Sequence, residues 1–251
     1  MTNNVRVAME SVLFLGGDTG ATRAFFNLVM DRLHEGSDSG QTVSFVPSVD
    51  APIPPSGCWI PCFGSTDKDA SARRALDFGA DLVAKLAVGG QDLSVYSAPA
   101  GALFVLAELV GSKPQPQRLG QVAFVDLYTP RAKEAANYYA NALSCRVIHE
   151  LKPTPGDYRF LAWGDEPVAG VVDMLDVLPE SVPPHWIPYW RVLDLEGEVA
   201  RLSDFGARVR VPVTESALGP FALLADPFGV TFGLQTPLSD NLLVEHAKSQ
   251  S

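Results

Sequence analysis

Side chains that can transfer protons alternate with apolar side chains along residues 184–192. The apolar positions are Trp186, Pro188, Trp190 and Val192, and the mixed positions between them are His185, Ile187, Tyr189 and Arg191. In a β-strand the two sets point to opposite faces, so the apolar set is expected to pack under a helix and the mixed set to line a ligand site. Histidine and tyrosine serve as general acids and bases. His185 and Tyr189 are therefore candidate catalytic residues, and Ile187 and Arg191 are candidate ligand contacts.

Two further segments with the same alternation supply the rest of the candidate site. One face of residues 121–128 holds Val122, Phe124, Asp126 and Tyr128, and one face of the last strand holds Thr231, Gly233 and Gln235. Asp126 is a third candidate catalytic residue, and the other candidate ligand contacts are Phe124, Tyr128, Thr231, Gly233 and Gln235. An apolar floor with a few converging polar groups is the usual composition of a small-molecule site.

Each polar candidate also has a purely structural interpretation. His185 can sit at the start of its strand with the ring bonded to a loop, and Tyr189 can be an ordinary aromatic wall. Asp126 and Arg191 can pair with each other or lie at the rim in solvent. The sequence alone leaves these alternatives open.

Signatures of several other functions are missing. There is no Gly-x-Ser-x-Gly motif, and the glycine-rich segment 16–20 lacks the Lys-Ser/Thr of a nucleotide-binding loop. The formal net charge is −10 and Lys and Arg form no block, which disfavours nucleic acid as a partner. No apolar run approaches the roughly 20 residues that span a bilayer, and residues 1–10 lack the pattern of a secretory signal. We therefore expect a cytoplasmic protein with no membrane partner.

The three cysteines, Cys58, Cys62 and Cys145, are consistent with a reducing compartment. Cys58 and Cys62 stand four positions apart among Trp, Ile, Pro and Phe, which favours one face of a strand. No other Cys or His stands nearby at zinc-finger spacing. The sequence predicts two buried thiols on a sheet face and no zinc site.

The chain contains an internal duplication. Residues 58–63, Cys-Trp-Ile-Pro-Cys-Phe, return 127 positions later as His-Trp-Ile-Pro-Tyr-Trp, and the same spacing relates Phe-Gly-Ala at 78–80 to 205–207 and Asp67 to Asp194. At 251 residues there is room for two domains of about 110 residues each. We expect a first domain at residues 1–110, a linker at 111–119, a second domain at 120–237 and a tail at 238–251.

The second domain is predicted to contain two βαβββ units. Its expected strands are residues 121–127, 146–151, 158–163, 169–172, 186–192, 209–211, 222–225 and 230–234, and its expected helices are residues 132–143 and 195–205. Asp194 is expected to cap the second helix, and Asp226 to form a turn before the last strand. Neither aspartate is therefore taken as catalytic.

The first domain follows the same plan but is shorter. Its expected helix, residues 21–33, aligns Phe25 and Phe26 with Tyr138 and Tyr139 at a spacing of 113, whereas the later Trp-Ile-Pro strand is spaced by 127. The difference between the two spacings means that 14 residues are missing from the first domain between its helix and the Trp-Ile-Pro strand. At ~3.3 Å per residue this is the length of one or two strands, and only residues 42–47 of that region are strand-like. We therefore expect a partly degenerate first domain and a single working site per chain, in residues 120–237.

These segments resemble the vicinal oxygen chelate superfamily, also called the glyoxalase, bleomycin-resistance and dioxygenase fold. The matching pieces include Phe-Val-Asp-Leu-Tyr-Thr-Pro at 124–130, Tyr-Tyr at 138–139, His-Trp-Ile-Pro-Tyr-Trp-Arg at 185–191, Phe-Gly-Ala at 205–207 and Asp-Pro-Phe-Gly at 226–229. The more specific likeness is to two-domain glyoxalase-like proteins of actinobacteria that are loosely labelled hydroxylases. The resemblance implies an α+β fold in which tandem βαβββ units form two U-shaped sheets, with helices outside and a ligand cavity inside.

The resemblance also implies where a metal would be bound, because metal-using members place His, Gln or Glu on the first and last strands of each unit. The corresponding positions here are Phe124, Ile187 and Gly233, with Ile60 and Val105 in the first domain. These side chains offer a divalent cation no nitrogen, oxygen or sulfur donor, so we expect no metal and no other cofactor. A register shift of two residues would instead bring His185 or Asp126 to the centre of the cavity.

The fold does not define the reaction, because this superfamily includes isomerases, dioxygenases, thiol transferases and drug-binding proteins. The candidate residues favour a metal-independent enzyme that moves protons on a small apolar, cyclic or aromatic metabolite, for example by isomerisation or cyclisation in natural-product biosynthesis. The alternative is a non-catalytic protein that binds a small molecule or a drug and confers resistance. A metal-dependent lyase or dioxygenase ranks third. The expected partner is a small-molecule ligand, and the chain is expected to be a monomer or a homodimer.

Overall fold

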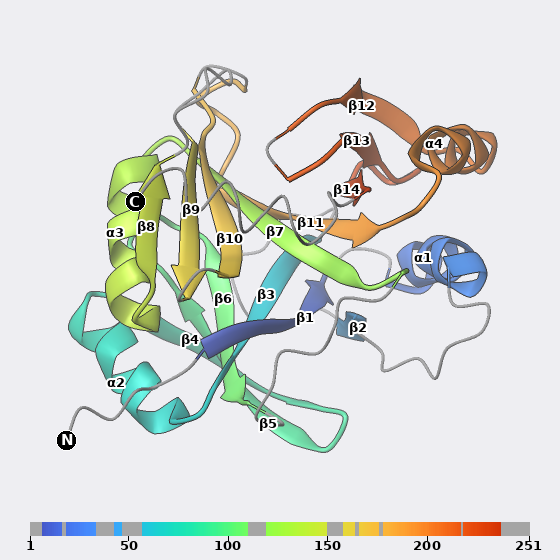
Figure 1. Cartoon of the computed structure of the whole chain (residues 1–251). Helices are drawn as coiled ribbons and strands as arrows, with labels where there is room; N and C mark the ends of the chain where they lie inside the picture. The colour runs from blue at the N-terminus through green and yellow to red at the C-terminus, as the bar shows by residue number, and fades with distance from the viewer. Residues whose placement is uncertain are drawn as a thin grey trace.

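Figure 1 shows the alternation of helices and strands along the chain in this computed structural model. The structure describes residues 7–16, 19–33, 43–46, 57–109, 119–149, 158–163, 166–175, 178–216 and 218–236. The first half contains β1 (Val7–Leu15), α1 (Thr19–Leu33), β2 (Val43–Val46), β3 (Cys58–Ser65), α2 (Lys68–Asp77), β4 (Asp81–Val88), β5 (Gln91–Ser97) and β6 (Leu103–Glu108). The second half contains β7 (Val122–Thr129), α3 (Ala132–Leu143), β8 (Arg146–His149), β9 (Tyr158–Trp163), β10 (Glu166–Asp173), β11 (His185–Arg191), α4 (Leu195–Asp204), β12 (Arg208–Thr214), β13 (Phe221–Ala225) and β14 (Thr231–Gln235).

Four units of strands and a helix share one connectivity. In each unit the first strand pairs in parallel with the last, as β1 does with β2, β3 with β6, β7 with β10 and β11 with β14. Antiparallel pairs then join the two units of each half, β1 to β3 and β7 to β11. A single residue pair, Trp59 with Trp186, links the halves into one 14-stranded sheet. The expected α+β fold built from tandem units is confirmed.

The two halves differ in their outer strands. The second half runs β8-β9-β10-β7-β11-β14-β13-β12, whereas the first runs β2-β1-β3-β6-β5-β4. β2, which falls within the expected strand at residues 42–47, holds the position next to β1 that β10 holds next to β7. In the described part of the first unit no strands correspond to β8 and β9. The expectation of a partly degenerate first half is therefore confirmed.

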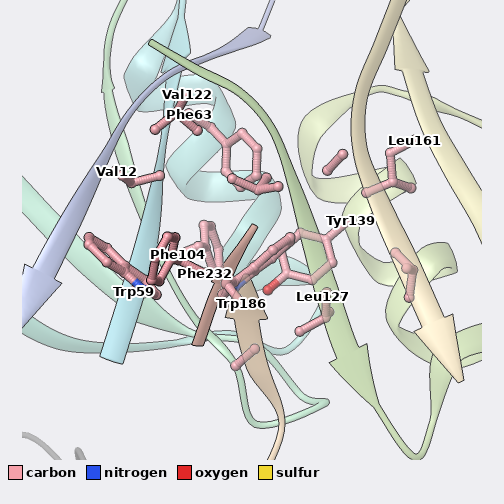
Figure 2. Close-up of a cluster of buried hydrophobic side chains, with 14 of the residues drawn as sticks. Val12, Trp59, Phe63, Phe104, Val122, Leu127, Tyr139, Leu161, Trp186 and Phe232 are labelled. Carbon is pink, nitrogen blue, oxygen red and sulfur yellow. The ribbon is translucent and has the colours of Figure 1, made fainter. Parts of the chain in front are cut away.

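One hydrophobic core is shared by both halves, and Figure 2 shows part of it. Helix α1 of the first half packs on the second half, where Phe26 stacks on Trp190 with ring centroids 5.2 Å apart. Helix α3 of the second half packs on the first half, where the ring centroids of Tyr139 and Phe63 lie 6.4 Å apart. Each half thus buries one of its helices against the other half.

The two faces of β11 differ as the alternation predicts. Trp186, Trp190 and Val192 belong to the shared core, whereas Ile187 and Tyr189 form a separate cluster with Leu223. We call the face opposite the shared core the site face of the second half. Its residues on β7 and β11 are Phe124, Asp126, Tyr128, His185, Ile187 and Tyr189.

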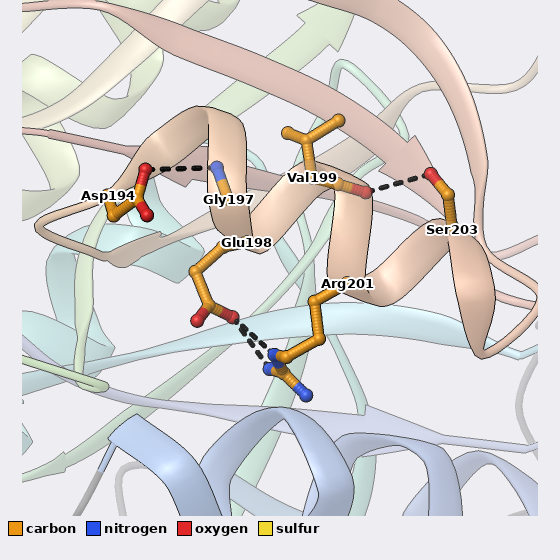
Figure 3. A network of polar contacts seen from close by, with 6 residues as sticks. All are labelled: Asp194, Gly197, Glu198, Val199, Arg201 and Ser203. Carbon is orange, nitrogen blue, oxygen red and sulfur yellow. Dashed lines mark hydrogen bonds and ion pairs between the residues drawn. The ribbon is translucent and has the colours of Figure 1, made fainter.

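Aspartates begin the two helices that the duplication relates. Asp67 Oδ1 accepts a hydrogen bond from the backbone N–H of Ala70 at 2.9 Å. Asp194 Oδ1 accepts one from the backbone N–H of Gly197 at 2.9 Å, which Figure 3 shows. Each carboxylate satisfies a backbone donor that has no partner within the helix, and it lies at the positive end of the helix dipole. The predicted capping role of Asp194 is confirmed.

Replacing either capping aspartate by alanine is expected to lower the free energy of unfolding by about 1 kcal/mol, because one backbone donor of the helix loses its partner. Asparagine in place of Asp67 or Asp194 should restore most of the loss. Urea unfolding of the Ala and Asn variants measures this difference. An alanine at the exposed Asp92 serves as the control, and equal effects of Ala and Asn at the caps would contradict the capping role.

Asp226 forms the turn that was predicted before the last strand. Its Oδ1 accepts hydrogen bonds from the backbone N–H groups of Phe228 at 2.9 Å and Val230 at 2.8 Å. Gly229 adopts a φ of +96°, which the turn requires and which favours glycine. Burial raises the pKa of Asp226 above its ordinary value. This aspartate therefore has a structural role.

Parts of the predicted domain organisation lie outside the described residues. These are residues 111–118 of the expected linker and the tail at residues 238–251. The division into two domains at that linker stays a prediction. Among the helices that the structure describes, none is long and apolar enough to cross a membrane.

Candidate functional site

A buried carboxylate lies at the centre of the site face. Asp126 on β7 is 6% exposed, and it stands between Ile187 on β11 and Gly170 on β10. Its Oδ1 accepts a hydrogen bond of 2.7 Å from the hydroxyl of Tyr158 on β9. Three strands thus place an acid and a phenol in direct contact.

Gly170 leaves the space that this contact occupies. A Cβ built on Gly170 would lie 2.0 Å from Asp126 Oδ1 and 2.1 Å from the hydroxyl oxygen of Tyr158. Both distances are far shorter than any non-bonded contact with carbon. The hydrogen bond between Asp126 and Tyr158 therefore depends on glycine at position 170.

Two more tyrosines adjoin the carboxylate. Burial raises the pKa of Tyr189 well above its ordinary value, and the charge of Asp126 and a hydrogen bond to it raise this pKa further. Burial, followed by the charge of Asp126, also raises the pKa of Tyr128, while a hydrogen bond with Tyr189 opposes this rise. At neutral pH both phenols therefore keep their protons and can donate hydrogen bonds.

Aromatic rings surround the polar groups. Phe160 lies 4.8 Å from Tyr158 and 6.1 Å from Phe124 between ring centroids. Phe221 of β13 lies 6.0 Å from Tyr189 at the other side of the face. Aromatic rings favour edge-to-face contacts with one another, and a ring-shaped ligand on this face would make contacts of the same kind. The site face therefore suits a planar, mostly apolar ligand.

His185 lies at the start of β11, at the end of the face where Tyr128 stands. The two rings stack with centroids 5.6 Å apart and an interplanar angle of 14°. His185 Nδ1 lies 2.9 Å from the carbonyl oxygen of Pro183. Because a carbonyl only accepts, Nδ1 carries the proton and Nε2 of the neutral ring is an acceptor. Burial lowers the pKa of His185, which favours this neutral form. The loop hydrogen bond weighed as a structural alternative for His185 is present, so a catalytic role stays a prediction.

The remaining predicted contacts lie further along the face. In the parallel ladder between β11 and β14, Gly233 lies opposite Tyr189 and Gln235 lies opposite Arg191. Ile187 lies opposite Asp126 in the sheet. Arg191 is four residues further along β11, which is roughly 13 Å in an extended strand. The structure thus groups Asp126 with the tyrosines and places Arg191 and Gln235 toward the far end of the strand.

Thr231 lies at the start of β14, where it pairs with Ala225. Its carbonyl oxygen accepts a hydrogen bond of 3.0 Å from the indole N–H of Trp59 in the first half. The backbone of Thr231 therefore links the two halves. Its predicted ligand contact stays a prediction.

The positions that would hold a metal do not fit one. Phe124 and Ile187 have hydrocarbon side chains, and Gly233 has none. A Cβ on Gly233 would lie 2.2 Å from Cδ1 of Tyr189, so the tyrosine ring fills the place of a longer side chain. Within the residues that the structure describes, no three His, Cys, Asp or Glu side chains gather in a group that could hold a metal ion.

The corresponding face of the first half is apolar. Ile60, Val105 and Cys62 belong there to a cluster of aliphatic side chains, and Cys58 is packed against it. Burial raises the pKa of the Cys58 thiol to about 12, so the thiol stays protonated and unreactive. Cys62 is buried as predicted, whereas Cys58 is only partly buried.

Val122 was predicted on the site face and lies instead in the shared core. The reason is a bulge. Tyr189 pairs with Phe124 and the next residue, Trp190, pairs with Val122, so one residue of β7 is skipped. An extra residue reverses the alternation of the strand beyond it.

Four residues of the site were not among the predicted ones: Tyr158, Phe160, Gly170 and Phe221. The alternation along residues 158–163, which were predicted as a strand, would have placed Tyr158 and Phe160 on one face. A glycine inside a strand often marks a close approach of other groups, which was the signal available for Gly170. No local pattern distinguished Phe221.

The fold matches solved structures of glyoxalases and ring-cleaving dioxygenases. The Mn(II)-bound glyoxalase from Novosphingobium aromaticivorans superposes with a TM-score of 0.66 and 15% identity, covering 94% of this chain and 84% of that one. The 2,2',3-trihydroxybiphenyl 1,2-dioxygenase from Sphingomonas wittichii strain RW1 superposes with a TM-score of 0.63 and 10% identity, covering 91% and 90%. At such identities the likeness shows the fold alone.

Similar sequences come from actinobacteria. The anthracycline biosynthesis protein DnrV of Streptomyces peucetius is 27% identical over 191 residues, which are 70% of this chain and 64% of that protein. The putative glyoxylase CFP32 of Mycobacterium tuberculosis is 28% identical over 126 residues, which are 49% of this chain and 48% of that protein. The matches thus span about two thirds and about half of these relatives, and no protein-family model matches the chain. The chain has the vicinal oxygen chelate fold shared by glyoxalases and extradiol dioxygenases, and it is similar in sequence to actinobacterial glyoxalase-like and anthracycline-biosynthesis proteins.

Proposed function

We propose that the site face of the second half binds a small apolar metabolite with a cyclic or aromatic skeleton and that the protein moves protons on it without a metal. Isomerisation and cyclisation are the reaction types that fit. The observation that carries the proposal is the hydrogen bond between Asp126 and Tyr158 at the centre of an aromatic face. Positioned carboxylates and phenols are general acids and bases.

The failure of the metal positions to fit a cation supports metal independence. Phe124, Ile187 and Gly233 give no donor atoms, and the ring of Tyr189 fills the space over Gly233. Elemental analysis of untagged protein tests this point. Stoichiometric zinc, iron, manganese or nickel that is lost in His185→Ala would favour the metal-dependent lyase or dioxygenase instead.

A biosynthetic role is proposed from the relatives. DnrV of Streptomyces peucetius and DauV of Streptomyces sp. strain C5 are both named for anthracycline biosynthesis, and each aligns with 70% of this chain. The alternative is a non-catalytic binding or resistance protein, which the aromatic lining of the site face would equally suit. Incubation with an extract of the source organism separates the two: an enzyme yields a converted compound, and a binder returns the ligand unchanged.

A ligand found in this way is expected to bind once per chain. The reason is that the corresponding face of the first half is aliphatic and lacks an acid or a phenol in its cluster. In calorimetry, His185→Ala and Tyr189→Ala should weaken binding tenfold or more. Cys58→Ala and Cys62→Ala, their counterparts in the duplication, should cost only about 1 kcal/mol of stability.

Two outcomes would contradict this assignment. A stoichiometry of two ligands per chain would show that both halves bind. Loss of binding in the cysteine variants but not in the His185 and Tyr189 variants would move the site to the first half.

A further inference from the structure

We propose that Tyr158 and Asp126 form a proton relay for a planar ring substrate that carries an acidic proton, either the hydroxyl proton of an enol or a phenol or a proton on the carbon beside the carbonyl group of an enolisable ketone. This inference rests on the proposed function and names its substrate class. Tyr158 is the catalytic residue that touches the substrate, and Asp126 acts through it.

The burial of the two residues sets their order in the relay. Asp126 is 6% exposed, whereas Tyr158 is half-buried and within reach of a ligand. The Tyr158 hydroxyl donates a hydrogen bond of 2.7 Å to Asp126 Oδ1. A hydroxyl oxygen that donates still accepts through its lone pairs. A substrate proton can therefore bond to the Tyr158 oxygen while the carboxylate receives the phenol proton.

The transfer balances without a co-reactant. The substrate O–H or C–H bond breaks, and its proton forms a new O–H bond with the Tyr158 oxygen. The former proton of Tyr158 bonds to Asp126 Oδ1, and the electron pair stays on the substrate as an enolate. Reversal of the relay returns the proton to another atom of the enolate, so the net change is an isomerisation that uses no oxidant or reductant.

A hydroxyl group next to the relay can donate a hydrogen bond to the enolate oxygen. Tyr128 is half-buried on the same face, and burial and the charge of Asp126 keep its hydroxyl protonated. A fixed hydroxyl of this kind stabilises an oxygen that gains negative charge. After the transfer Asp126 is neutral, so it no longer repels the enolate. Before the transfer its charge disfavours phosphates and carboxylates as ligands.

The rings indicate a planar skeleton for the substrate. Phe160 is half-buried and lies 4.8 Å from Tyr158, so a ring that hydrogen-bonds to Tyr158 would meet Phe160 directly. Phe124 extends this wall behind Phe160 at 6.1 Å. An aromatic wall and one polar anchor fix both the plane and the orientation of a ring ligand.

Binding is tested with 2-naphthol and 2-methoxynaphthalene, which differ in the hydroxyl proton. Wild-type protein should bind 2-naphthol about tenfold more tightly in calorimetry, because the ether has no proton to donate to Tyr158. Tyr158→Phe should remove this preference. Asp126→Asn keeps an acceptor for the Tyr158 hydroxyl, so its affinity for 2-naphthol should change less than threefold.

Proton transfer is tested with 2-tetralone in D₂O, by following the loss of its proton signals beside the carbonyl in NMR spectra. Wild-type protein should accelerate the exchange above the buffer rate. Asp126→Asn and Tyr158→Phe should lower this acceleration about 100-fold. Gly170→Ala should lower it as well, because its methyl group separates the pair. Tyr96→Phe, the same change in the core of the first half, is the control, and thermal unfolding shows which variants remain folded.

The outcomes separate the relay from the proposed function. Retained exchange in folded Asp126→Asn, or equal binding of 2-naphthol and its ether by wild-type protein, would overturn the relay and leave ring binding intact. If wild-type protein binds neither naphthalene and leaves the exchange of 2-tetralone at the buffer rate, the proposed function falls together with the relay.

Discussion

Phe26→Ala is expected to lower the free energy of unfolding of the whole chain by about 3–5 kcal/mol, the cost of removing a large buried ring. The side chain is 0% exposed. Its ring lies 4.9 Å from Trp59 of the first half, 5.2 Å from Trp190 and 5.1 Å from Phe232 of the second half. Alanine would remove one aromatic contact from each of these three rings, in a core that cannot close up without moving both halves.

Because the lost contacts belong to both halves, the chain should still unfold in one transition at a lower denaturant concentration. Urea unfolding followed by tryptophan fluorescence and by circular dichroism measures this. Phe78→Ala, at a ring that is 48% exposed, is the control and should change stability by no more than about 0.5 kcal/mol. Two separate transitions would show that the halves are stable independently. A loss below about 1 kcal/mol in Phe26→Ala would show that this ring contributes little to the shared core.

This shared core gives the degenerate first half a physical role. Tyr138 of α3 donates a hydrogen bond of 3.5 Å to the carbonyl oxygen of Ala75 in α2, and Arg131 donates one of 2.7 Å to the carbonyl oxygen of Pro99. The helix that follows β7 is therefore held by the first half. Asp126 lies on β7, so the first half supports the strand that carries the candidate site.

The repeated units were predictable because their signals are local and occur more than once. The expected helix at residues 132–143 coincides with α3, and the expected strand at 158–163 coincides with β9. The capping role of Asp194 followed from its residue type and from its counterpart Asp67. A pattern that returns at a fixed spacing can be checked against its own copy, and this makes a fold prediction from one sequence secure.

The hydrogen bonds and close contacts of the site could not be predicted in the same way. Asp126 and Tyr158 are 32 residues apart, and their contact depends on the register of three strands. The bulge that moves Val122 into the core is a pairing between distant strands and has no local signal. The sequence correctly placed polar groups on one face of β7 and β11, but only the fold shows that the tyrosines gather around the carboxylate.

Gly233→Ala is expected to lower the free energy of unfolding by about 1–3 kcal/mol, the usual cost of an extra methyl group in a packed core. The added Cβ would lie 2.2 Å from Cδ1 of Tyr189 and 2.8 Å from its Cγ. These atoms are near the base of the side chain, so a small rotation does not clear them. Tyr189 is only 4% exposed and is packed against Phe221, so its displacement should also weaken ligand binding.

A double-mutant cycle with Tyr189→Ala isolates this contact. In the Tyr189→Ala background the new methyl group of Gly233→Ala meets no ring, so its cost should vanish, although Tyr189→Ala alone is itself destabilising. Urea unfolding of the four proteins gives the coupling energy. An equal cost of Gly233→Ala in both backgrounds would place the strain in the backbone of β14. A coupling of 1 kcal/mol or more would show that the ring of Tyr189 occupies the space over Gly233, where metal-using proteins of this fold carry a ligand on the last strand.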